Sequence, residues 1–372
     1  MCYRFRRTAT TILALLGVFS SLSCSGASIN VLPGATNPLA PTSSYSQQAG
    51  AALVTLQGWY SQSTGLYATP TGWWNTANSI TVLGDYEQIT GSAAYDSAIA
   101  NTFTAAQAQH VSFLDDYYDD DGWWALAWIE AYDAIENPQY LTMAETIFTA
   151  MTGGWDTTCG GGVWWSTSKS YKNAIPNELF LTTAAELANR TTGSDSAAYL
   201  NWAQKEWTWF KSSGMINTQN LVNDGLDSSN PDACKNNGRT TWTYNQGVIL
   251  GGLVELYKAD KDPSLLPQAE VIASAAMTNL ARNGILTEPG TLSGGDAPQF
   301  KGIFMRNLMA LYAAAPNAQY KNFADANAAG IIANDQGPDW EFGGLWQGPF
   351  DQGDATRQTS AIDALLAAAA ME

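Results

Sequence analysis

The sequence predicts an all-α fold in which a single domain of six helical hairpins closes into a toroid. The first observation is a repeated Gly-Trp-Trp motif, at Gly72–Trp74 and again at Gly122–Trp124 about fifty residues later. The second is the spacing of the expected helix starts, about 50 to 67 residues, which leaves room for two helices and their loops in each interval. Later apolar helices begin near Asn177, Tyr244, Lys301 and Ser360.

The third observation is helical periodicity. Apolar residues recur at i, i+3 or i+4, and i+7, whereas the strict alternation typical of strands is scarce. These helices are apolar on more than one side, as expected for an inner ring that packs against an outer ring. An open helical solenoid is the alternative, because periodicity does not distinguish a ring from an arc. The recurring residues are Phe180, Ala184 and Leu187; Leu250, Leu253, Val254 and Tyr257; and Phe304, Leu308, Leu311 and Tyr312.

The N-terminal segment 1–27 has the layout of a secretory signal peptide. Three arginines within the first seven residues precede the apolar run Ile12–Phe19, and small residues follow. The run is too short to span a bilayer, so we expect cleavage after Ala27 and a secreted, extracellular protein. A lipoprotein anchor through Cys24 is the alternative, but Ser21 stands where such a motif needs an apolar residue.

Beyond the signal peptide we expect a Pro- and Ser-rich lead over residues 28–48 and one folded domain over residues 49–372. The later sequence holds no stretch long and apolar enough for a membrane helix. The alanine-rich segment Ala364–Ala370 lacks the polar spacer and long tail of a glycolipid-anchor signal. The sequence therefore predicts a soluble monomer with no membrane anchor in its mature form.

The charge balance is strongly acidic. Removal of residues 1–27 takes away three arginines and no acids, so the formal net charge changes from −17 to about −20. Such a surface repels nucleic acid and anionic membranes, and it suits a neutral substrate. Because 45% of the residues are hydrophobic and only 14% are charged, the chain can bury a large core.

Four cysteines are present, and two of them, Cys2 and Cys24, leave with the signal peptide. An exported chain usually pairs its remaining cysteines, so we expect a disulfide between Cys159 and Cys234, with two buried thiols as the alternative. The sequon that begins at Asn189 is a predicted N-glycosylation site.

The single histidine, His110, excludes several chemistries. Ser-His-Asp and Cys-His mechanisms would both need it, and a His-rich zinc site is impossible, so we expect no metal site. An ordinary, partly buried role is the simpler interpretation of His110. The run Gly160–Gly162 is not a phosphate-binding loop, because no Gly-Lys-Ser/Thr follows it, and we expect no cofactor.

The densest chemical cluster is Asp115–Trp124, which holds five aspartates among aromatic residues. An acidic helix start explains one or two of them. A calcium loop of the EF-hand type fails, because Tyr117 and Trp128 stand where it needs Asp and Glu, and a calcium site of another kind is the remaining metal alternative. The remaining interpretation is a glycosidase dyad, in which one carboxyl group protonates the leaving oxygen and a second, ionised one acts as nucleophile or base.

Aromatic residues support the glycosidase interpretation. Adjacent acids raise one another's proton affinity, and neighbouring indole rings exclude water, so one member of a pair stays protonated. Aromatic faces also provide platforms for sugar rings, although many of the 15 tryptophans serve only as core. The candidates near Gly-rich loops are Trp73, Trp74, Trp164, Trp165, Trp242, Trp340 and Trp346.

Four stretches of the chain resemble glycoside hydrolase family 76, the endo-α-1,6-mannanases, in a fungal-type member. Together they run in family order from about residue 50 to the C-terminus, and the aspartate–tryptophan stretch is the most specific of them. They are Tyr117–Trp128, Cys159–Trp165, Tyr171–Glu178 and Trp242–Gly247.

The resemblance implies an (α/α)6 barrel that cleaves internal α-1,6-mannosidic bonds of a mannan backbone with retention. The family's consecutive aspartates match Asp119 as nucleophile and Asp120 as general acid/base, counted back from Trp124. Asp121 makes the run a triplet, so the pair Asp120 and Asp121 is the alternative register. Retention itself does not follow from the sequence, because backbone conformation sets the separation of the two carboxyl groups.

The expected partner is α-1,6-linked mannan or a manno-oligosaccharide. The alternatives are a cell-wall mannan transglycosylase, a non-catalytic glycan-binding protein, and cleavage of a different sugar bond on the same toroid. Further substrate contacts are expected near the inner helix starts, where the loops of a toroid converge. These candidates are Tyr118, Trp74, Trp165, Asn177, Trp242 and Lys301.

Overall fold

The computed structural model describes residues 44–227 and 233–372, and all of them belong to one compact unit. Twelve α-helices and two short antiparallel hairpins make up the regular structure of these residues. The predicted signal peptide 1–27 lies outside the described residues, as does most of the Pro- and Ser-rich segment 28–48. The first helix begins at Tyr45, so the last residues of the predicted lead 28–48 are already helical.

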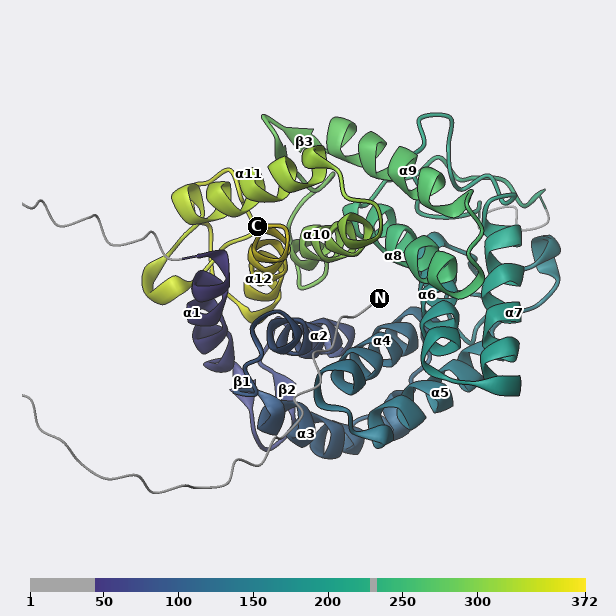
Figure 1. The fold of residues 1–372 in the computed structure, drawn as a ribbon, viewed down its shortest axis with the longest axis horizontal. Coiled ribbons are helices and arrows are strands. Elements are labelled where there is room, and N and C mark those ends of the chain that lie inside the picture. Colours follow the sequence, from purple (N-terminus) through teal and green to yellow (C-terminus); the bar gives the residue numbers. More distant parts are fainter. Residues whose placement is uncertain (1–43, 228–232) are drawn as a thin grey trace, which may run out of the picture. The chain divides into compact units, whose positions relative to one another are not determined.

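The helices alternate between an inner and an outer ring (Figure 1). The inner ring consists of α2 (Trp73–Thr90), α4 (Tyr118–Ile135), α6 (Ala174–Arg190), α8 (Thr243–Asp260), α10 (Ala297–Ala314) and α12 (Ala355–Ala370). The outer ring consists of α1 (Tyr45–Gln57), α3 (Asp96–Ala105), α5 (Pro138–Thr152), α7 (Gly193–Phe210), α9 (Leu265–Asn279) and α11 (Ala318–Asn334).

Short elements join the rings. Strands β1 (Tyr60–Ser61) and β2 (Leu66–Tyr67) pair with Tyr60 opposite Tyr67, and β3 (Ala281–Arg282) pairs with β4 (Ile285–Leu286). Four 3-10 turns lie in the connections of the described residues: η1 (Ala106–Ala108), η2 (Val111–Phe113), η3 (Thr158–Gly160) and η5 (Pro338–Trp340).

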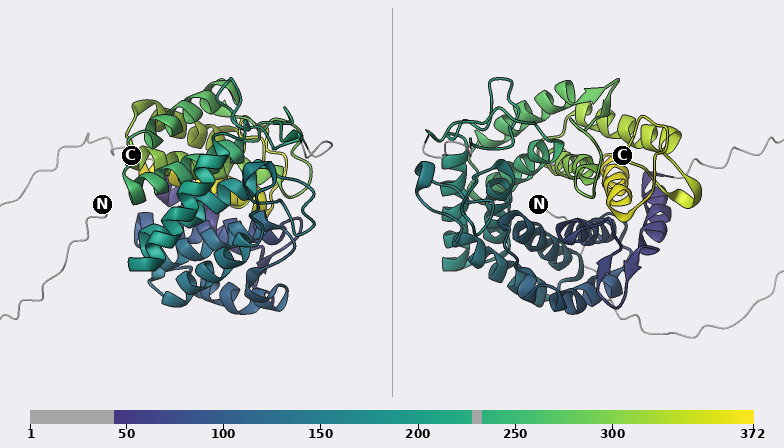
Figure 2. Two further views of the ribbon diagram at one scale, coloured as in Figure 1. Left: turned by 90° about the vertical axis from the view of Figure 1, so that its right-hand side faces the viewer. Right: turned by 180° about the vertical axis from the view of Figure 1, so that it is seen from behind.

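The ring is closed. Helix α12 packs against both α10 and α2, and α1 packs against α12, so the last hairpin joins the first. Figure 2 shows the same closed arrangement from the side and from behind. The predicted toroid of helical hairpins is therefore confirmed, and the open-solenoid alternative is wrong for the described residues.

Glycines let the inner helices approach one another closely. A Cβ atom on Gly247 of α8 would lie 2.6 Å from the Cα atom of Phe304 in α10. A Cβ atom on Gly302 of α10 would lie 2.5 Å from the Cα atom of Ser360 in α12. Because real Cβ atoms do not approach backbone this closely, larger residues at these two positions would push the ring apart.

Polar side chains also join neighbouring inner helices. The amide nitrogen of Asn75 donates to Gln299 over 2.6 Å, and the hydroxyl groups of Ser79 and Thr359 are 2.7 Å apart. These side chains are fully buried, so their hydrogen bonds replace the water that they lose on folding. The pairs align α2 with α10 and with α12, and so fix the helix starts relative to one another.

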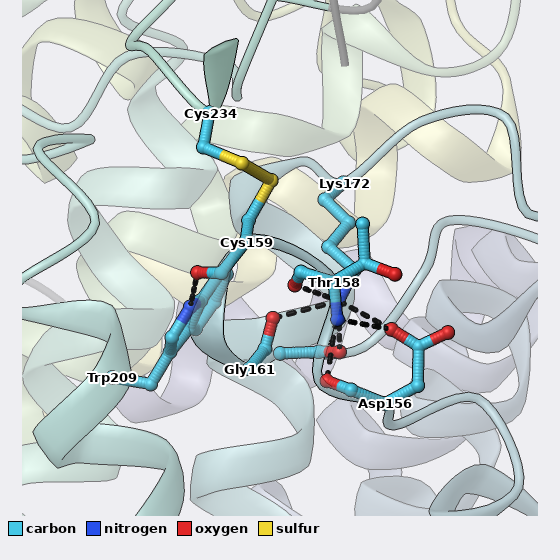
Figure 3. The surroundings of a disulfide bond; sticks show 8 residues. Asp156, Thr158, Cys159, Gly161, Lys172, Trp209 and Cys234 are labelled. Atoms are coloured by element: carbon cyan, nitrogen blue, oxygen red, sulfur yellow. Dashed lines mark hydrogen bonds and ion pairs between the residues drawn. A yellow bond between two sulfur atoms is a disulfide. The ribbon is translucent and has the colours of Figure 1, made fainter. Parts of the chain in front are cut away.

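The predicted disulfide between Cys159 and Cys234 is present, with the two Cα atoms 5.3 Å apart (Figure 3). Beside it the buried Lys172 ammonium donates to the carbonyl oxygens of Thr158, Gly161 and Gly162, over 2.7–2.9 Å, and to the Asp156 carboxylate over 3.0 Å. These bonds fix the backbone of the loop around η3 to the Lys172 ammonium. The disulfide fixes the same loop at Cys159.

None of the helices among the described residues is long and apolar enough to cross a membrane.

Candidate active site

A cleft of about 400 Å³ lies at the end of the barrel where the inner helices begin. Its residues come from the first turns of α2, α4, α8 and α10 and from the loops that precede α6, α8 and α10. Aromatic side chains and carboxylates predominate among them. The lining consists of Trp74, Asp119, Trp123, Trp165, Tyr171, Asn173, Asp224, Arg239, Tyr244, Asp296 and Phe300.

Four aromatic rings from four inner-helix positions contact one another in a closed set within this lining. The Trp74 ring stacks on Trp123 at 5.5 Å and on Phe300 at 6.0 Å between ring centroids. The Tyr244 ring stacks on Phe300 at 3.9 Å and on Trp123 at 6.4 Å. We call these four residues the aromatic floor, and its flat apolar faces suit the C–H faces of a sugar ring.

Asp119 lies in the first turn of α4 and lines the cleft. The indole N–H of Trp165 donates to its Oδ2 over 3.0 Å, while its Oδ1 accepts no hydrogen bond from the described residues. Burial raises the pKa of Asp119 to about 7, and the hydrogen bond from Trp165 opposes that rise. One oxygen of this carboxyl group is thus held in place by the indole, and the other is buried.

Asp120 is the next residue along the same turn, and unlike Asp119 it is not among the residues that line the cleft. Burial, and then the nearby charges of Asp119 and Asp115, raise the pKa of Asp120 well above its ordinary value. Burial and the two neighbouring carboxyl groups therefore favour a retained proton on Asp120.

Asp121, the third aspartate, is only 2% exposed and has a different environment. Its Oδ1 accepts the backbone N–H of Asp115 over 3.0 Å, which ties the preceding loop to the helix. Burial raises the pKa of Asp121 to about 8. Like Asp120, it is not among the residues that line the cleft.

The cleft lining carries two further carboxylates. Asp224 accepts a hydrogen bond from the Tyr171 hydroxyl over 2.5 Å and from the Trp242 indole over 3.2 Å. Asp296 accepts from the Trp74 indole over 2.9 Å. These bonds orient two rings of the cleft and leave acceptor oxygens beside them that suit sugar hydroxyl groups.

The predicted substrate contacts fall into two groups. Trp74 and Trp165 line the cleft, and Trp242 lies at its edge through Asp224 and an edge contact with Phe300. The other three predicted contacts, Tyr118, Asn177 and Lys301, lie outside the lining.

These three side chains have structural partners instead. The Tyr118 ring packs on Gly154. The fully buried Asn177 amide exchanges hydrogen bonds with both backbone groups of Val163, at 2.6 and 2.9 Å. The Lys301 ammonium donates to the Gly344 carbonyl over 2.6 Å and lies over the Trp346 ring. Each residue is near an inner helix start, as expected, but its side chain faces away from the cleft.

Sequence reasoning missed several residues of the lining. Tyr171, Asn173 and Tyr244 lie within stretches that carry the family resemblance, which was a usable signal. The loop residues Asp224 and Arg239 had no such signal, because only the folded loops bring them to the cleft. Trp123, which also lies within such a stretch, was missed as well, as were Asp296 and Phe300.

A second hollow, of about 340 Å³, lies where the inner helices end, and we call it the basal hollow. Trp123 lines both spaces and so separates them. Ion pairs surround the basal hollow: Arg190 with Asp133, Lys258 with Glu255, and Arg306 with Asp363. Its charged lining residues are Asp85, Glu130, Asp133, Glu186, Arg190, Glu255, Lys258 and Arg306.

The structure also describes the predicted glycosylation site and the arrangement of potential metal ligands. Asn189, the predicted glycosylation site, is exposed in the last turn of α6, and its amide nitrogen donates to Glu255 over 2.9 and 3.0 Å. Within residues 44–227 and 233–372 no group of three or more His, Cys, Asp or Glu side chains could hold a metal ion.

A closed helical barrel with consecutive carboxyl groups at an inner helix start, above an aromatic floor, defines a glycoside hydrolase. The chain belongs to glycosyl hydrolase family 76, whose model matches residues 44–372. The (α/α)6 barrel expected from the resemblance is thereby confirmed.

Similar proteins come from fungi and bacteria. Mannan endo-1,6-alpha-mannosidase DFG5 of Candida albicans is 26% identical over 344 residues, which cover 83% of this chain and 74% of that protein. The structure of Lin0763 from Listeria innocua matches with a TM-score of 0.80 at 25% identity, over 88% of this chain and 97% of that one. A second structure is that of an inactive variant of the α-1,6-mannanase GH76A of Salegentibacter in complex with α-1,6-mannotriose. It matches with a TM-score of 0.79 at 22% identity, over 88% of this chain and 100% of that one.

Proposed function

We propose that this protein is a secreted, endo-acting hydrolase of α-1,6-linked mannan that works with retention through Asp119 and Asp120. The observation that carries the proposal is the opposed environment of the two neighbouring carboxyl groups. Asp119 accepts a hydrogen bond from an indole N–H, which favours its ionised form, whereas burial and the charges of Asp119 and Asp115 favour the protonated form of Asp120. Retaining glycosidases need this difference between nucleophile and acid.

In the first step the Asp119 carboxylate attacks the anomeric carbon while Asp120 gives its proton to the leaving glycosidic oxygen. The carbon–oxygen bond breaks, and a mannosyl ester forms on Asp119. In the second step Asp120, now ionised, takes a proton from water as the water oxygen attacks the anomeric carbon. The ester breaks, Asp119 returns to carboxylate, and Asp120 is protonated again.

The aromatic floor and the two further carboxylates of the lining account for a neutral, polymeric substrate. Stacking of sugar rings on Trp74 and Phe300 would supply apolar contact, and Asp224 and Asp296 would accept hydrogen bonds from hydroxyl groups. Family relatives support mannan as the polymer, since DFG5 of Candida albicans is named a mannan endo-1,6-alpha-mannosidase. The Salegentibacter enzyme is an α-1,6-mannanase inactivated by changes at two consecutive aspartates, which supports the assignment of the pair.

Two features support action outside the cell. The segment 1–27 has the pattern of a signal peptide, and disulfides such as Cys159–Cys234 persist mainly in oxidising, extracellular compartments.

The test is release of reducing ends from debranched α-1,6-mannan by the purified protein and by Asp119→Asn and Asp120→Asn. We expect both variants to lose activity by about three orders of magnitude or more while keeping the melting temperature of a folded protein. Asp121→Asn is the matched control, because its amide oxygen still accepts the Asp115 N–H, and we expect it to stay within about tenfold of the parent.

Product analysis separates the remaining possibilities. Retention predicts that the first product detected by NMR has the α-anomeric configuration. Products longer than the substrate would show that a sugar hydroxyl replaces water, and would assign the protein as a transglycosylase. Mannan binding without new reducing ends from the folded parent would overturn the hydrolase proposal.

A further inference from the structure

Two exposed aromatic side chains lie in contact at the rim of the cleft. Tyr117 is 41% exposed and Trp165 is 36% exposed, and their ring centroids are 4.9 Å apart. Only Trp165 belongs to the cleft lining, so the Tyr117 ring extends the aromatic surface beyond the cleft. The reaction steps above do not use Tyr117. We call this pair of residues the outer platform.

The other large hydrophobic side chains that are exposed among the described residues differ from this pair. They are all aliphatic, and each comes from a different element or connection. Single exposed apolar side chains are normal on a protein surface, whereas an exposed apolar patch beside a groove is typical of a ligand-binding surface. These four residues are Val54, Val111, Val271 and Leu345.

Backbone hydrogen bonds hold the outer platform in place without a ligand. Tyr117 is the extended residue immediately before α4 (φ −119°, ψ 118°), and it pairs with Ser166 in an isolated antiparallel bridge. The Tyr118 N–H donates to the Trp165 carbonyl over 2.9 Å, and the Trp165 N–H donates to the Tyr171 carbonyl over 2.8 Å. Because these bonds already fix the backbone, a ligand that binds here orders few new groups.

The outer platform adjoins the reacting group. The Trp165 indole N–H donates to Asp119 over 3.0 Å, so a sugar bound at Asp119 lies beside the Trp165 ring. A chain that continues outward from there reaches Tyr117. An α-1,6 linkage has one more rotatable bond than a linkage between two ring carbons, so its chain loses more conformational freedom on binding. A rigid aromatic surface offsets that cost.

Polar side chains follow Trp165 along the chain. The hydroxyl groups of Ser166 and Ser168 lie 2.8 Å apart, and the Thr167 hydroxyl donates to Asp116 over 3.2 Å. Thr167 and Ser168 are exposed. A neutral sugar has apolar C–H faces and hydroxyl groups around its edge, and aromatic rings with hydroxyl groups nearby match that combination.

We propose that Tyr117 and Trp165 bind one further mannose residue of the α-1,6-linked chain outside the cleft, with the Tyr117 ring as its main apolar contact. This inference rests on the proposed function, in which α-1,6-linked mannan is the substrate. The outer platform then sets the preferred chain length, because an oligosaccharide that covers Tyr117 gains a contact that a shorter one lacks.

The experiment measures kcat/KM on α-1,6-manno-oligosaccharides of increasing length, from mannobiose upward, for the parent, Tyr117→Ala and Tyr117→Phe. In the parent, kcat/KM should rise at the length that first reaches Tyr117. Tyr117→Ala should lose about fivefold to tenfold on the longer substrates and little on the shorter ones, because only the ring contact is removed. Tyr117→Phe keeps the ring and should restore the parent's length profile.

Val111→Ala is the matched control. It also removes an exposed apolar side chain from the connection before α4, but Val111 is not among the residues that line the cleft. Its length profile should match that of the parent.

Binding is measured separately by titration calorimetry in the inactive Asp119→Asn variant, with and without Tyr117→Ala. We expect the second change to weaken binding of the longer oligosaccharides by about fivefold to tenfold and to leave binding of the shorter ones unchanged. Because no bond is cleaved in this background, the difference reports the ring contact alone.

Several results would overturn the outer platform. They are an unchanged length profile in Tyr117→Ala, equal losses at every length, and a loss in Tyr117→Phe as large as that in Tyr117→Ala. Sedimentation of the parent as a dimer that Tyr117→Ala separates would assign the exposed rings to self-association instead.

Failure of the proposed function gives a different result. If the folded parent releases no reducing ends at any oligosaccharide length, the proposed function is wrong, and the calorimetric comparison still decides whether Tyr117 binds the sugar. If the parent hydrolyses the oligosaccharides and Tyr117→Ala keeps its length profile, the proposed function stands and only the outer platform is rejected.

Discussion

The cleft and the basal hollow lie at opposite ends of the same inner helices and share Trp123 as a wall. Both contain buried carboxyl groups, but their partners differ. At the cleft end, Asp119 accepts an indole N–H and Asp120 follows it in the same turn of α4, and no described lysine or arginine forms an ion pair with either. In the basal hollow, guanidinium and ammonium groups pair with the carboxylates.

The helix dipole gives a physical reason for the difference. At the N-terminal end of α4, unpaired backbone N–H groups create a positive potential that tolerates anions without a cation. At the C-terminal ends of the inner helices the potential is negative, so acids there need a cation or a proton. The cleft therefore keeps carboxyl groups available for chemistry, whereas the basal hollow uses its cations to stabilise the ring.

The largest expected effect comes from the wall between the two spaces. Trp123 is 3% exposed and belongs to the aromatic floor, so Trp123→Ala joins the spaces and removes a stacking surface. We expect the free energy of unfolding in urea to fall by about 3–5 kcal/mol, with loss of most mannan hydrolysis by the protein that remains folded.

Trp128→Ala is the matched control, because Trp128 is fully buried in the same helix and lines neither space. It should lose similar stability and keep its activity below its melting temperature. Equal activity losses in the two variants would show that the floor has no special part in catalysis.

A smaller effect is expected from the basal hollow alone. Arg190 donates to both oxygens of Asp133 at 2.9–3.0 Å and lies 3.7 Å from Glu255, so Arg190→Met leaves Asp133 without its cation and Glu255 with Lys258 alone. We expect the free energy of unfolding to fall by about 3 kcal/mol, with kcat unchanged at temperatures where the variant is folded.

Lys258→Met provides the comparison for that variant. Lys258 pairs with the same Glu255, but its side chain is 48% exposed, so the loss should be about 1 kcal/mol or less. If Arg190→Met lowers kcat as strongly as it lowers stability, the basal hollow does not serve stability alone.

The smallest effect is a dependence of stability on pH. Burial raises the pKa of Asp85 to about 6, of Asp363 to about 7 and of Glu186 to about 8. Because these values exceed the unfolded ones, the groups contribute stability that is fully present below about pH 4 and is lost as the pH rises through about 6 to 8. The melting temperature should therefore fall across that range, and Glu186→Gln should fall less. A melting temperature that rises over the same range would contradict the assignment.

Much of the fold could be predicted from local patterns. The repeated Gly-Trp-Trp motif and the apolar periodicity identified the helices, because helix formation depends on residues three and four positions apart. The pairing of Cys159 with Cys234 followed from having only two cysteines after the signal peptide, and the structure confirms it. Asp119 was found because acidic and aromatic residues are adjacent in the sequence itself.

The contacts of individual side chains were harder to predict. Asn177 and Lys301 begin inner helices as expected, yet a residue's place on a helix does not say which way its side chain turns. A change of one position rotates a side chain by about 100° around the helix axis. Asn177 therefore bonds to Val163 and Lys301 to Gly344, while Tyr244 and Phe300, on the cleft side, were missed.

The sequence by itself determined a repeating all-α chain with a run of carboxyl groups set among aromatic residues, since both features are local. The tertiary structure decided that α1 packs against α12 to close the ring, and that Asp224 and Arg239 reach the cleft. It also decided which aspartate receives the Trp165 N–H. These are contacts between residues far apart along the chain, and they form only because burial of the inner ring against the outer ring brings the loops together.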